Sequence, residues 1–371
     1  MYKRQIYIYD RLDEPSRGML EENLAVAEGG EMAVTFATGM AAVSGALGIL
    51  TSSGNQIVAH HVLYGCTHSL LTSWLPRYKI HTDFCDLTQP ESLTKVATKD
   101  CRVVYFETPV NPTMELIDMR AVRRVVDQLN SHRPEAEKIH IVVDNTFATP
   151  YCQRPLQHGV DLVIHSMTKD IGGFGTGMGG VVIGASRYWN LLMLYRKDFG
   201  GVLSPNCAWP ILVYGLPTLA TRMVNQQKCA MHIAEFLLRQ PKVARVVYPG
   251  LPGYPQRELA HRQMTTVDGT FAPGSMLYFE LKGNGGDVKS AAEAAERFVD
   301  YVAEKSYTIT LAVSLGQIKT LIENPFSMTH AAVPEEEKLQ CGLRPGGIRL
   351  SLGLEDWHDI TADLEDALQA V

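Results

Sequence analysis

The strongest constraint on the fold is a series of short apolar runs separated by helical stretches. The runs are Gln56–Leu63, Arg102–Phe106, Ile139–Val143, Leu162–Ile164 and Val181–Ile183. Stretches such as Ala41–Leu50 and Met119–Asn130 have helical spacing. Short apolar strands that alternate with helices are typical of a mainly parallel sheet covered by helices on both faces. We therefore predict an α/β fold for this part of the chain.

Polar residues follow the first four runs, at the positions where the predicted strands end. In such sheets ligands bind beyond the carboxyl ends of the strands. The sequence therefore predicts one site that gathers residues from four strand ends. In chain order these residues are Tyr64, then Glu107 and Asn111, then Asp144, and finally Ser166, Thr168 and Lys169.

The pattern changes after Ser204, where a long helical stretch from about Leu216 to Arg239 is followed by shorter apolar segments. A chain of 371 residues is also long for a single domain. We predict an N-terminal arm over residues 1–14, a large domain over 15–214 and a smaller α+β domain over 215–371. The arm has too few apolar positions to fold alone and requires a partner surface.

Composition excludes several classes of protein. Lys and Arg number 34 against 40 Asp and Glu, a net charge of −6, and no basic stripe indicates nucleic-acid binding. No apolar run reaches the roughly 18 residues needed to span a membrane. The seven cysteines form no CxxC pair, which predicts no zinc site, no disulfide framework and a cytoplasmic location. His60, His61 and His165 lack metal-ligand spacing, so no metal is expected.

Lys169 lies in a constellation that fits pyridoxal 5'-phosphate (PLP). This cofactor needs a lysine that bonds to its aldehyde, donors for its phosphate and an acid at its pyridine nitrogen. Ser166 and Thr168 supply hydroxyls beside Lys169, and Asp144 ends an apolar run. The alternative is that Lys169 is a solvent-exposed loop residue. The nearby Ser166, Thr168 and Asp144 disfavour that interpretation.

Two further motifs bear on a bound phosphate. Thr38-Gly39-Met40 precedes a helical run, and backbone N–H groups at a helix start bind anions. An ordinary helix start capped by Thr38 remains open from this motif alone. Gly175-Thr-Gly-Met-Gly-Gly180 matches the dinucleotide pattern GxGxxG, but it precedes a strand instead of opening a helix. An NAD-binding role is therefore disfavoured.

Taken together, the motifs resemble the Cys/Met-metabolism PLP enzymes, which have the aspartate-aminotransferase-like fold (PLP fold type I). The resemblance runs from about Tyr9 to the C-terminus and implies a homotetramer built from dimers that share active sites. It implies that Tyr9 and Arg11 reach the phosphate in a neighbouring subunit. The resemblance places Gly39 and Met40 in the phosphate loop and Tyr64 against the cofactor ring. Glu107 and Asn111 match one segment of the family, and Asp144 corresponds to the residue at the pyridine nitrogen. Ser166, Thr168 and Lys169 match the motif around the covalent bond, and Ser314 and Arg349 match residues that hold the substrate carboxylate.

Three features resemble the methionine γ-lyases within this family: Cys66, the pair Lys197-Asp198, and Val313 before Ser314. Cys66 taken alone equally fits a small buried hydrophobe. The resemblance implies α,γ-elimination of L-methionine or homocysteine, with Cys66, Lys197 and Asp198 shaping the thioether pocket. The segment before Tyr9 is shorter than in the family, so we expect a short or truncated arm.

Other features depart from that subgroup. Asp170 stands where an aromatic residue is common, Phe174 replaces a usual His, and Gly175-Thr-Gly resembles the sulfhydrylases. The alternatives are an O-acylhomoserine sulfhydrylase or cystathionine γ-synthase, a cystathionine or cysteine lyase, and an inactive binding or regulatory protein of the same fold. The last is disfavoured because Lys169, Asp144, Tyr64 and Arg349 are all present.

The resemblance also implies roles in proton transfer. Lys169 is expected to remove the substrate Cα proton, and Tyr64 to protonate the departing thiol as a general acid. A cationic cofactor and Arg11 beside the phenol would lower the pKa of Tyr64.

Overall fold

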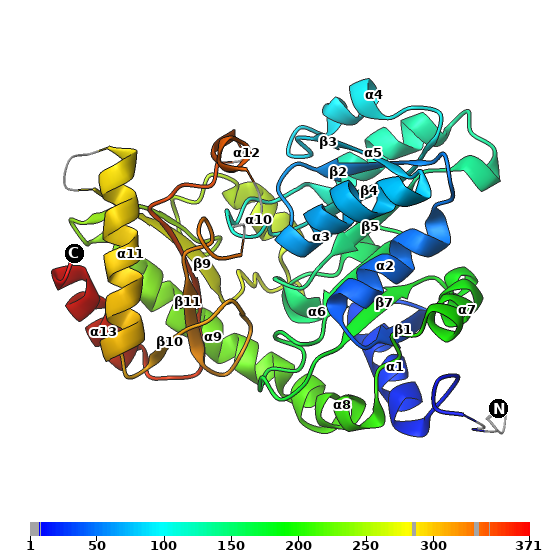
Figure 1. Ribbon diagram of the computed structural model, residues 1–371. Helices are drawn as coiled ribbons and strands as arrows, with labels where there is room; N and C mark the ends of the chain where they lie inside the picture. The colour runs from blue at the N-terminus through cyan, green and yellow to red at the C-terminus, as the bar shows by residue number, and fades with distance from the viewer. Residues whose placement is uncertain (1–6, 8, 284–286, 330–333, 341) are drawn as a thin grey trace.

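The computed structural model describes residues 7, 9–283, 287–329, 334–340 and 342–371. Two β-sheets organise these residues, and they lie in different halves of the molecule (Figure 1). Strands β1 to β7 form the first sheet and β8 to β12 form the second. The two sheets fall on either side of residue 215, where we predict the domain boundary.

The large sheet has seven strands in the order β1-β7-β6-β5-β4-β2-β3. Strands β3, β2, β4, β5 and β6 run parallel, whereas β7 is antiparallel to both β1 and β6. The prediction of a mainly parallel sheet is confirmed. The strands are β1 (Met32–Phe36), β2 (Gln56–His60), β3 (His81–Cys85), β4 (Cys101–Glu107), β5 (His140–Asp144), β6 (Leu162–Ser166) and β7 (Gly180–Gly184).

Both faces of the large sheet are buried because successive strand residues point to opposite sides. Val103 and Tyr105 pack with α2 (Gly39–Leu50) and its neighbours, whereas Val104 and Phe106 pack with α5 (Met119–Asn130) on the other face. The buried strands therefore appear in the sequence as continuous apolar runs. The edge strand β3 alternates exposed and half-buried residues instead, which explains why no apolar run predicted it.

The helices of the large half begin and end close to the predicted stretches. Thr38 caps α2 by accepting a hydrogen bond from the N–H of Ala41, and Asp118 caps α5 in the same way. The helices are α1 (Pro15–Glu28), α2 (Gly39–Leu50), α3 (Gly65–Ser69), α4 (Leu93–Val96), α5 (Met119–Asn130), α6 (Thr149–Cys152), α7 (Trp189–Phe199) and α8 (Pro205–Pro210).

The second sheet has the order β10-β11-β12-β9-β8. One face packs against α9, α11 and α13 in a core that includes Ile233, Phe298 and Leu364. Tyr278 on the other face packs with Met114 of the large half. The elements are α9 (Leu216–Leu238), β8 (Val243–Val247), α10 (Arg257–Gln263), β9 (Met276–Leu281), α11 (Val288–Lys305), β10 (Ile309–Leu311), β11 (Thr320–Glu323), α12 (Glu335–Gln340), β12 (Gly347–Ser351) and α13 (Trp357–Gln369).

None of the helices in the described part of the chain has both the length and the apolar character required to cross a membrane. The six cysteines in the same part are not joined in disulfides.

Candidate active site

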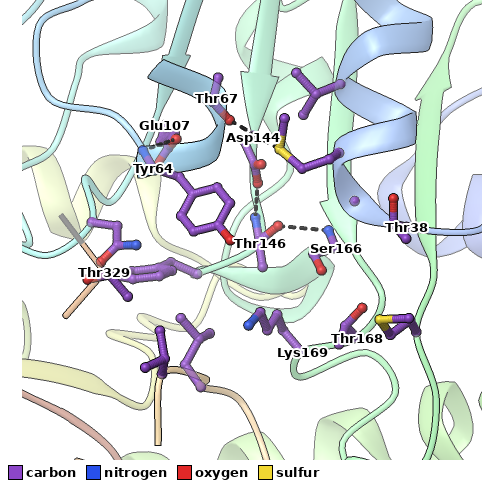
Figure 2. Close-up of a pocket in the computed structure, with 18 of the residues that line it drawn as sticks. Thr38, Tyr64, Thr67, Glu107, Asp144, Thr146, Ser166, Thr168, Lys169 and Thr329 are labelled. Atoms are coloured by element: carbon purple, nitrogen blue, oxygen red, sulfur yellow. Dashed lines mark hydrogen bonds between the residues drawn. The ribbon is translucent and has the colours of Figure 1, made fainter. Parts of the chain in front are cut away.

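One pocket collects residues from the ends of several strands of the large sheet and from the second sheet (Figure 2). The ends of β4, β5 and β6, the start of α2 and the segment after β2 form one side. Residues of the segment after β10 and Arg349 of β12 form the other. The predicted residues that line it are Gly39, Met40, Tyr64, Glu107, Asn111, Asp144, Ser166, Thr168, Lys169 and Arg349.

A close approach between two elements shapes the phosphate end of the pocket. A Cβ added to Gly39 would lie 2.9 Å from the Cβ of Ser166, so the start of α2 packs directly on the end of β6. A Cβ on Gly180 would lie 2.1 Å from the backbone oxygen of Thr38. Glycine is required at both positions, and the first residues of α2 line the same pocket as Ser166 and Thr168. An anion is favoured there.

Two carboxyl groups, of the buried Glu107 and the half-buried Asp144, belong to paired residues of neighbouring strands and line the pocket. Burial, followed by the adjacent carboxylate of Asp144, raises the pKa of Glu107 well above its usual range. Burial also raises the pKa of Asp144, but the N–H of Thr146, which donates to Oδ1 at 2.9 Å, opposes this shift, as do His165 and Lys169. The upward shift is the larger one at Glu107, so Glu107 is the member of the pair that holds a proton more readily. Glu107 also accepts a hydrogen bond from the N–H of Tyr64 at 2.8 Å.

Lys169 extends into the pocket after β6. Its Nζ donates a hydrogen bond to Oγ of Ser314 at 3.1 Å, which connects the two halves of the site. Burial, with a smaller contribution from the guanidinium of Arg349, lowers the pKa of Lys169 from its ordinary value. A lowered pKa increases the neutral, nucleophilic fraction of the amine.

The surroundings of Tyr64 within its own chain raise the pKa of its phenol. Burial and the hydrogen bond from Cys66, whose thiol lies 3.4 Å from the phenol oxygen, raise the pKa of Tyr64 well above its ordinary value. The carboxyl groups of Glu107 and Glu323 act in the same direction. Arg11 of the same chain donates to the carbonyl of Lys197. The expected lowering of the pKa depends on a bound cofactor and on the Arg11 of a neighbouring subunit, and it stays a prediction.

Arg349 lies at the second-sheet side of the pocket and is almost fully buried. Its Nη1 donates to Oδ1 of Asn111 at 3.1 Å and Nη2 donates to the carbonyl of Ser314 at 3.0 Å. An ion pair of 2.9 Å joins Nη1 to Glu323. The site therefore brings together Ser314, Asn111 and Arg349, as the sequence predicted, and adds Glu323.

Six predicted residues are not among those that line the pocket of their own chain. Ser314 accepts the hydrogen bond from Lys169, and Cys66 contacts the phenol of Tyr64. The other four lie in α7 and in the arm, where Arg11 donates to the carbonyl of Lys197. Arg11 stacks over the ring of Tyr9, which is 56% exposed, and Lys197 forms a surface ion pair with Asp198 at 3.2 Å.

The three histidines that lack metal-ligand spacing in the sequence have different surroundings. His165 is buried and its Nε2 lies 2.7 Å from Oε2 of Glu28. His60, His61 and Asp86 lie close enough for one ion. However, Nδ1 of the buried His60 accepts the N–H of Leu87 at 3.1 Å, so in the neutral ring Nε2 carries the proton and is no ligand.

Sequence reasoning missed several residues that complete the site. Thr146 accepts the N–H of Ser166 at 2.8 Å, and Phe147, Met178 and Thr329 line the pocket. Thr146 and Phe147 lie two and three residues after Asp144, so their position was a usable signal. Thr329 and Glu323 gave no such signal.

The residues of this pocket fit PLP. The start of α2 with Ser166 and Thr168 would hold the phosphate, and Tyr64 would cover the ring. The carboxyl group of Asp144, which lines the pocket, would provide the acceptor that a protonated pyridine nitrogen requires, and Lys169 provides an amine with lowered pKa.

Comparison with known proteins supports this fit. The pattern of the family described as "Cys/Met metabolism PLP-dependent enzyme" matches residues 2–369. The L-methionine gamma-lyase of Porphyromonas gingivalis is 39% identical over 98% of this chain and 86% of its own length. The O-succinylhomoserine sulfhydrylase of Pseudomonas aeruginosa is 34% identical over 98% of this chain and 84% of its own length.

Solved structures are similar over nearly the whole chain. Cystathionine gamma-lyase from Lactobacillus plantarum, complexed with L-serine, superimposes with a TM-score of 0.88 at 31% identity, covering 99% of this chain and 90% of that one. These findings confirm the predicted aspartate-aminotransferase-like fold and the predicted cofactor, PLP. The chain therefore belongs to the Cys/Met-metabolism family of PLP-dependent enzymes, whose members act on carbon–sulfur bonds.

Proposed function

We propose that this enzyme catalyses α,γ-elimination of L-methionine or homocysteine. For methionine, the reaction consumes water and releases 2-oxobutanoate, ammonia and methanethiol. The observation that carries the proposal is the convergence of Lys169, Asp144, Tyr64 and Arg349 on one pocket, with Cys66 in contact with the phenol of Tyr64. Relatives named L-methionine gamma-lyase at 37–39% identity support the same activity.

The chain's own residues divide the work. Bound PLP supplies an electron sink for the negative charge that develops at the substrate Cα. Arg349 and Ser314 bind and orient the substrate carboxylate. Lys169 removes the Cα proton and then moves a proton from Cβ. Tyr64 donates its phenolic proton to the departing sulfur. The carboxylate of Asp144 would stabilise the protonated pyridine nitrogen of the bound cofactor.

Product analysis tests this proposal directly. Purified enzyme with PLP is incubated separately with methionine, homocysteine, cystathionine, cysteine and O-acetylhomoserine. We expect methionine, supplied without a second substrate, to yield 2-oxobutanoate and methanethiol. Both products should be lost in Lys169→Ala. Methionine left intact while another substrate turns over would reject the proposed substrate but not the cofactor.

A γ-replacement transferase is the second candidate. Gly175-Thr-Gly resembles the sulfhydrylases, and a sulfhydrylase is among the similar proteins. Such an enzyme would use the same residues but add a thiol at Cγ. Rapid consumption of O-acetylhomoserine only when sulfide is present, with methionine inert, would favour this candidate. A cystathionine or cysteine lyase would instead be identified by turnover of those substrates.

We also propose an oligomeric state and a cellular location for this enzyme. Tyr9 and Arg11 lie outside the pocket of their own chain and match an arm that binds phosphate in a neighbouring subunit, so we propose a homotetramer of dimers with shared sites. The absence of disulfides among the described cysteines supports a cytoplasmic location.

A further inference from the structure

The hydrogen-bond donors of Arg349 are unevenly used. A guanidinium offers five N–H groups in a fixed plane. Nη1 donates to Asn111 and pairs with Glu323, and Nη2 donates once, to the Ser314 carbonyl. Nε is buried and has no hydrogen-bond partner among the described residues. The edge formed by Nε and Nη2 therefore keeps unused donors, although burial makes an unused donor unfavourable.

Glu323 occupies Nη1 because of the strand register. Glu323 of β11 lies directly opposite Arg349 of β12 in the antiparallel ladder, and both side chains are buried. Oε1 of Glu323 is 2.9 Å from Nη1 and also accepts the hydroxyl of Thr329 at 2.9 Å. Oε2 has no hydrogen-bond partner in the described part of the chain. A buried ion pair that leaves Oε2 of Glu323 without a hydrogen bond contributes little to the stability of the fold. This indicates a functional reason for the pair.

The same contacts connect Glu323 with the general-acid side of the pocket. Thr329 lines the pocket (Figure 2). A Cβ on Gly65 would lie 2.7 Å from the carbonyl oxygen of Thr329, so the backbone that follows Tyr64 packs on the residue that holds Glu323. One chain of contacts therefore extends from Tyr64 through Thr329 and Glu323 to Arg349.

We propose that Glu323 is a positioning residue for substrate recognition: it fixes Arg349 through Nη1, so that Nε and Nη2 are presented to the substrate carboxylate. This inference rests on the proposed function, in which Arg349 binds that carboxylate. The two N–H groups of this edge are parallel and match the two oxygens of a carboxylate. Glu323 acts through Arg349 and does not touch the substrate.

A purely electrostatic role for Glu323 has the opposite consequence. Its negative charge near the substrate carboxylate would repel it, so removal of that charge would tighten binding of carboxylate ligands. Positioning requires instead that removal of the oxygen acceptor weakens binding. The sign of the change distinguishes the two roles.

The experiment compares two probe ligands on the PLP-loaded enzyme. L-Norleucine has the shape of methionine without a leaving group, and L-norleucinol replaces its carboxylate with a neutral alcohol. Dissociation constants are obtained from the change in cofactor absorbance, and the ratio of the norleucinol constant to the norleucine constant measures carboxylate recognition. General damage to the pocket affects both ligands and cancels in this ratio.

We expect Glu323→Ala to reduce the ratio by about tenfold or more, because Arg349 loses its anchor. Glu323→Gln should stay near the wild-type ratio, since an amide oxygen still accepts from Nη1. The matched control is Glu280→Gln in the adjacent strand β9, where Glu280 pairs only loosely with Arg245, at 3.9 Å, and should leave the ratio unchanged. A wild-type or increased ratio in Glu323→Ala would overturn the proposal.

Two further variants keep the test decisive. If Glu323→Ala does not fold, Thr329→Val removes the hydroxyl that holds Oε1, and a ratio unchanged there would also overturn the proposal. Arg349→Ala separates this inference from the proposed function. A wild-type ratio in Arg349→Ala would reject the carboxylate clamp itself, whereas loss of the ratio there but not in Glu323→Ala would reject only the role of Glu323.

Discussion

At the scale of single residues, Tyr64 has an acidity set by its neighbours. Burial and Cys66 raise its pKa, which favours the protonated phenol, the form that a general acid needs. We therefore expect a decline of activity below the ordinary tyrosine pKa to originate in another group.

Tyr64→Phe tests this assignment. Removal of the phenolic proton donor should slow elimination by roughly 10²-fold or more, the usual contribution of a general acid. The wild-type rate should not decline with pH below the ordinary tyrosine pKa of about 10 through loss of this proton. Steady-state rates across pH check both statements. Tyr254→Phe is the control, because its hydroxyl bonds to the carbonyl of Met114 and does not line the pocket; an equal loss there would contradict the assignment.

Asp170, beside Lys169, gives a prediction about stability. Its side chain is 1% exposed and neither carboxyl oxygen has a hydrogen-bond partner among the described residues. Burial raises its pKa from 3.8 to about 6, although Arg222 and Lys169 oppose the shift. Between these values the folded state binds a proton that the unfolded state releases. Stability from this group is therefore complete below pH 3.8 and is lost as the pH rises through about 6.

Asp170→Asn should remove that pH dependence. The shift of about two pKa units corresponds to a free energy of unfolding on the order of 3 kcal/mol. We expect the variant to be more stable than the wild type by up to that amount at pH 8, and the difference to vanish toward pH 4. Denaturant unfolding at several pH values measures it. A difference that does not change with pH would contradict this explanation.

At the scale of elements, the phosphate site depends on how closely the start of α2 approaches β6. Gly39→Ala should displace Ser166, because the added Cβ would lie 2.9 Å from the Cβ of Ser166. Loss of one charge-assisted hydrogen bond to the phosphate should weaken PLP binding about tenfold or more. The dissociation constant of PLP, measured by titration of apoenzyme, checks this.

The matched control lies in the glycine-rich segment. A Cβ on Gly177 would have its nearest neighbour, the Sγ of Cys207, at 3.8 Å, an ordinary contact. Gly177→Ala should therefore bind PLP normally. Equal weakening in both variants would show that the close approach of α2 and β6 is not the cause.

Elements also explain which parts of the site were predictable from sequence. Asp144 and Lys169 follow apolar strands whose ends must meet at one edge of a parallel sheet, so pattern alone placed them together. Glu323 ends a strand of four residues, and its importance comes only from the register that sets it opposite Arg349. That register is a long-range pairing that no local pattern reveals. The antiparallel direction of β7 was hidden for the same reason.

At the scale of the whole molecule, the site is divided between two sheets. Lys169 of the large half donates to Ser314 of the second half, so the geometry of the pocket depends on how these halves pack. Asn111 and Arg349 form a second such connection. Substrate that contacts both halves would therefore bind only when they are correctly positioned.

The proposed sharing of sites between subunits can be tested by mixing inactive variants. Arg11→Ala should lose PLP affinity and activity if Arg11 binds phosphate in a neighbouring subunit, while Lys169→Ala has no reactive amine. In a mixed dimer, the chain that retains Lys169 receives an intact Arg11 from its partner, which restores one complete site. Denaturing and refolding the two variants together should thus yield activity that neither yields alone. If Arg11 instead serves its own chain, or only stabilises the contact with Lys197, every site in the mixture stays defective and the activity equals the sum of the separate preparations.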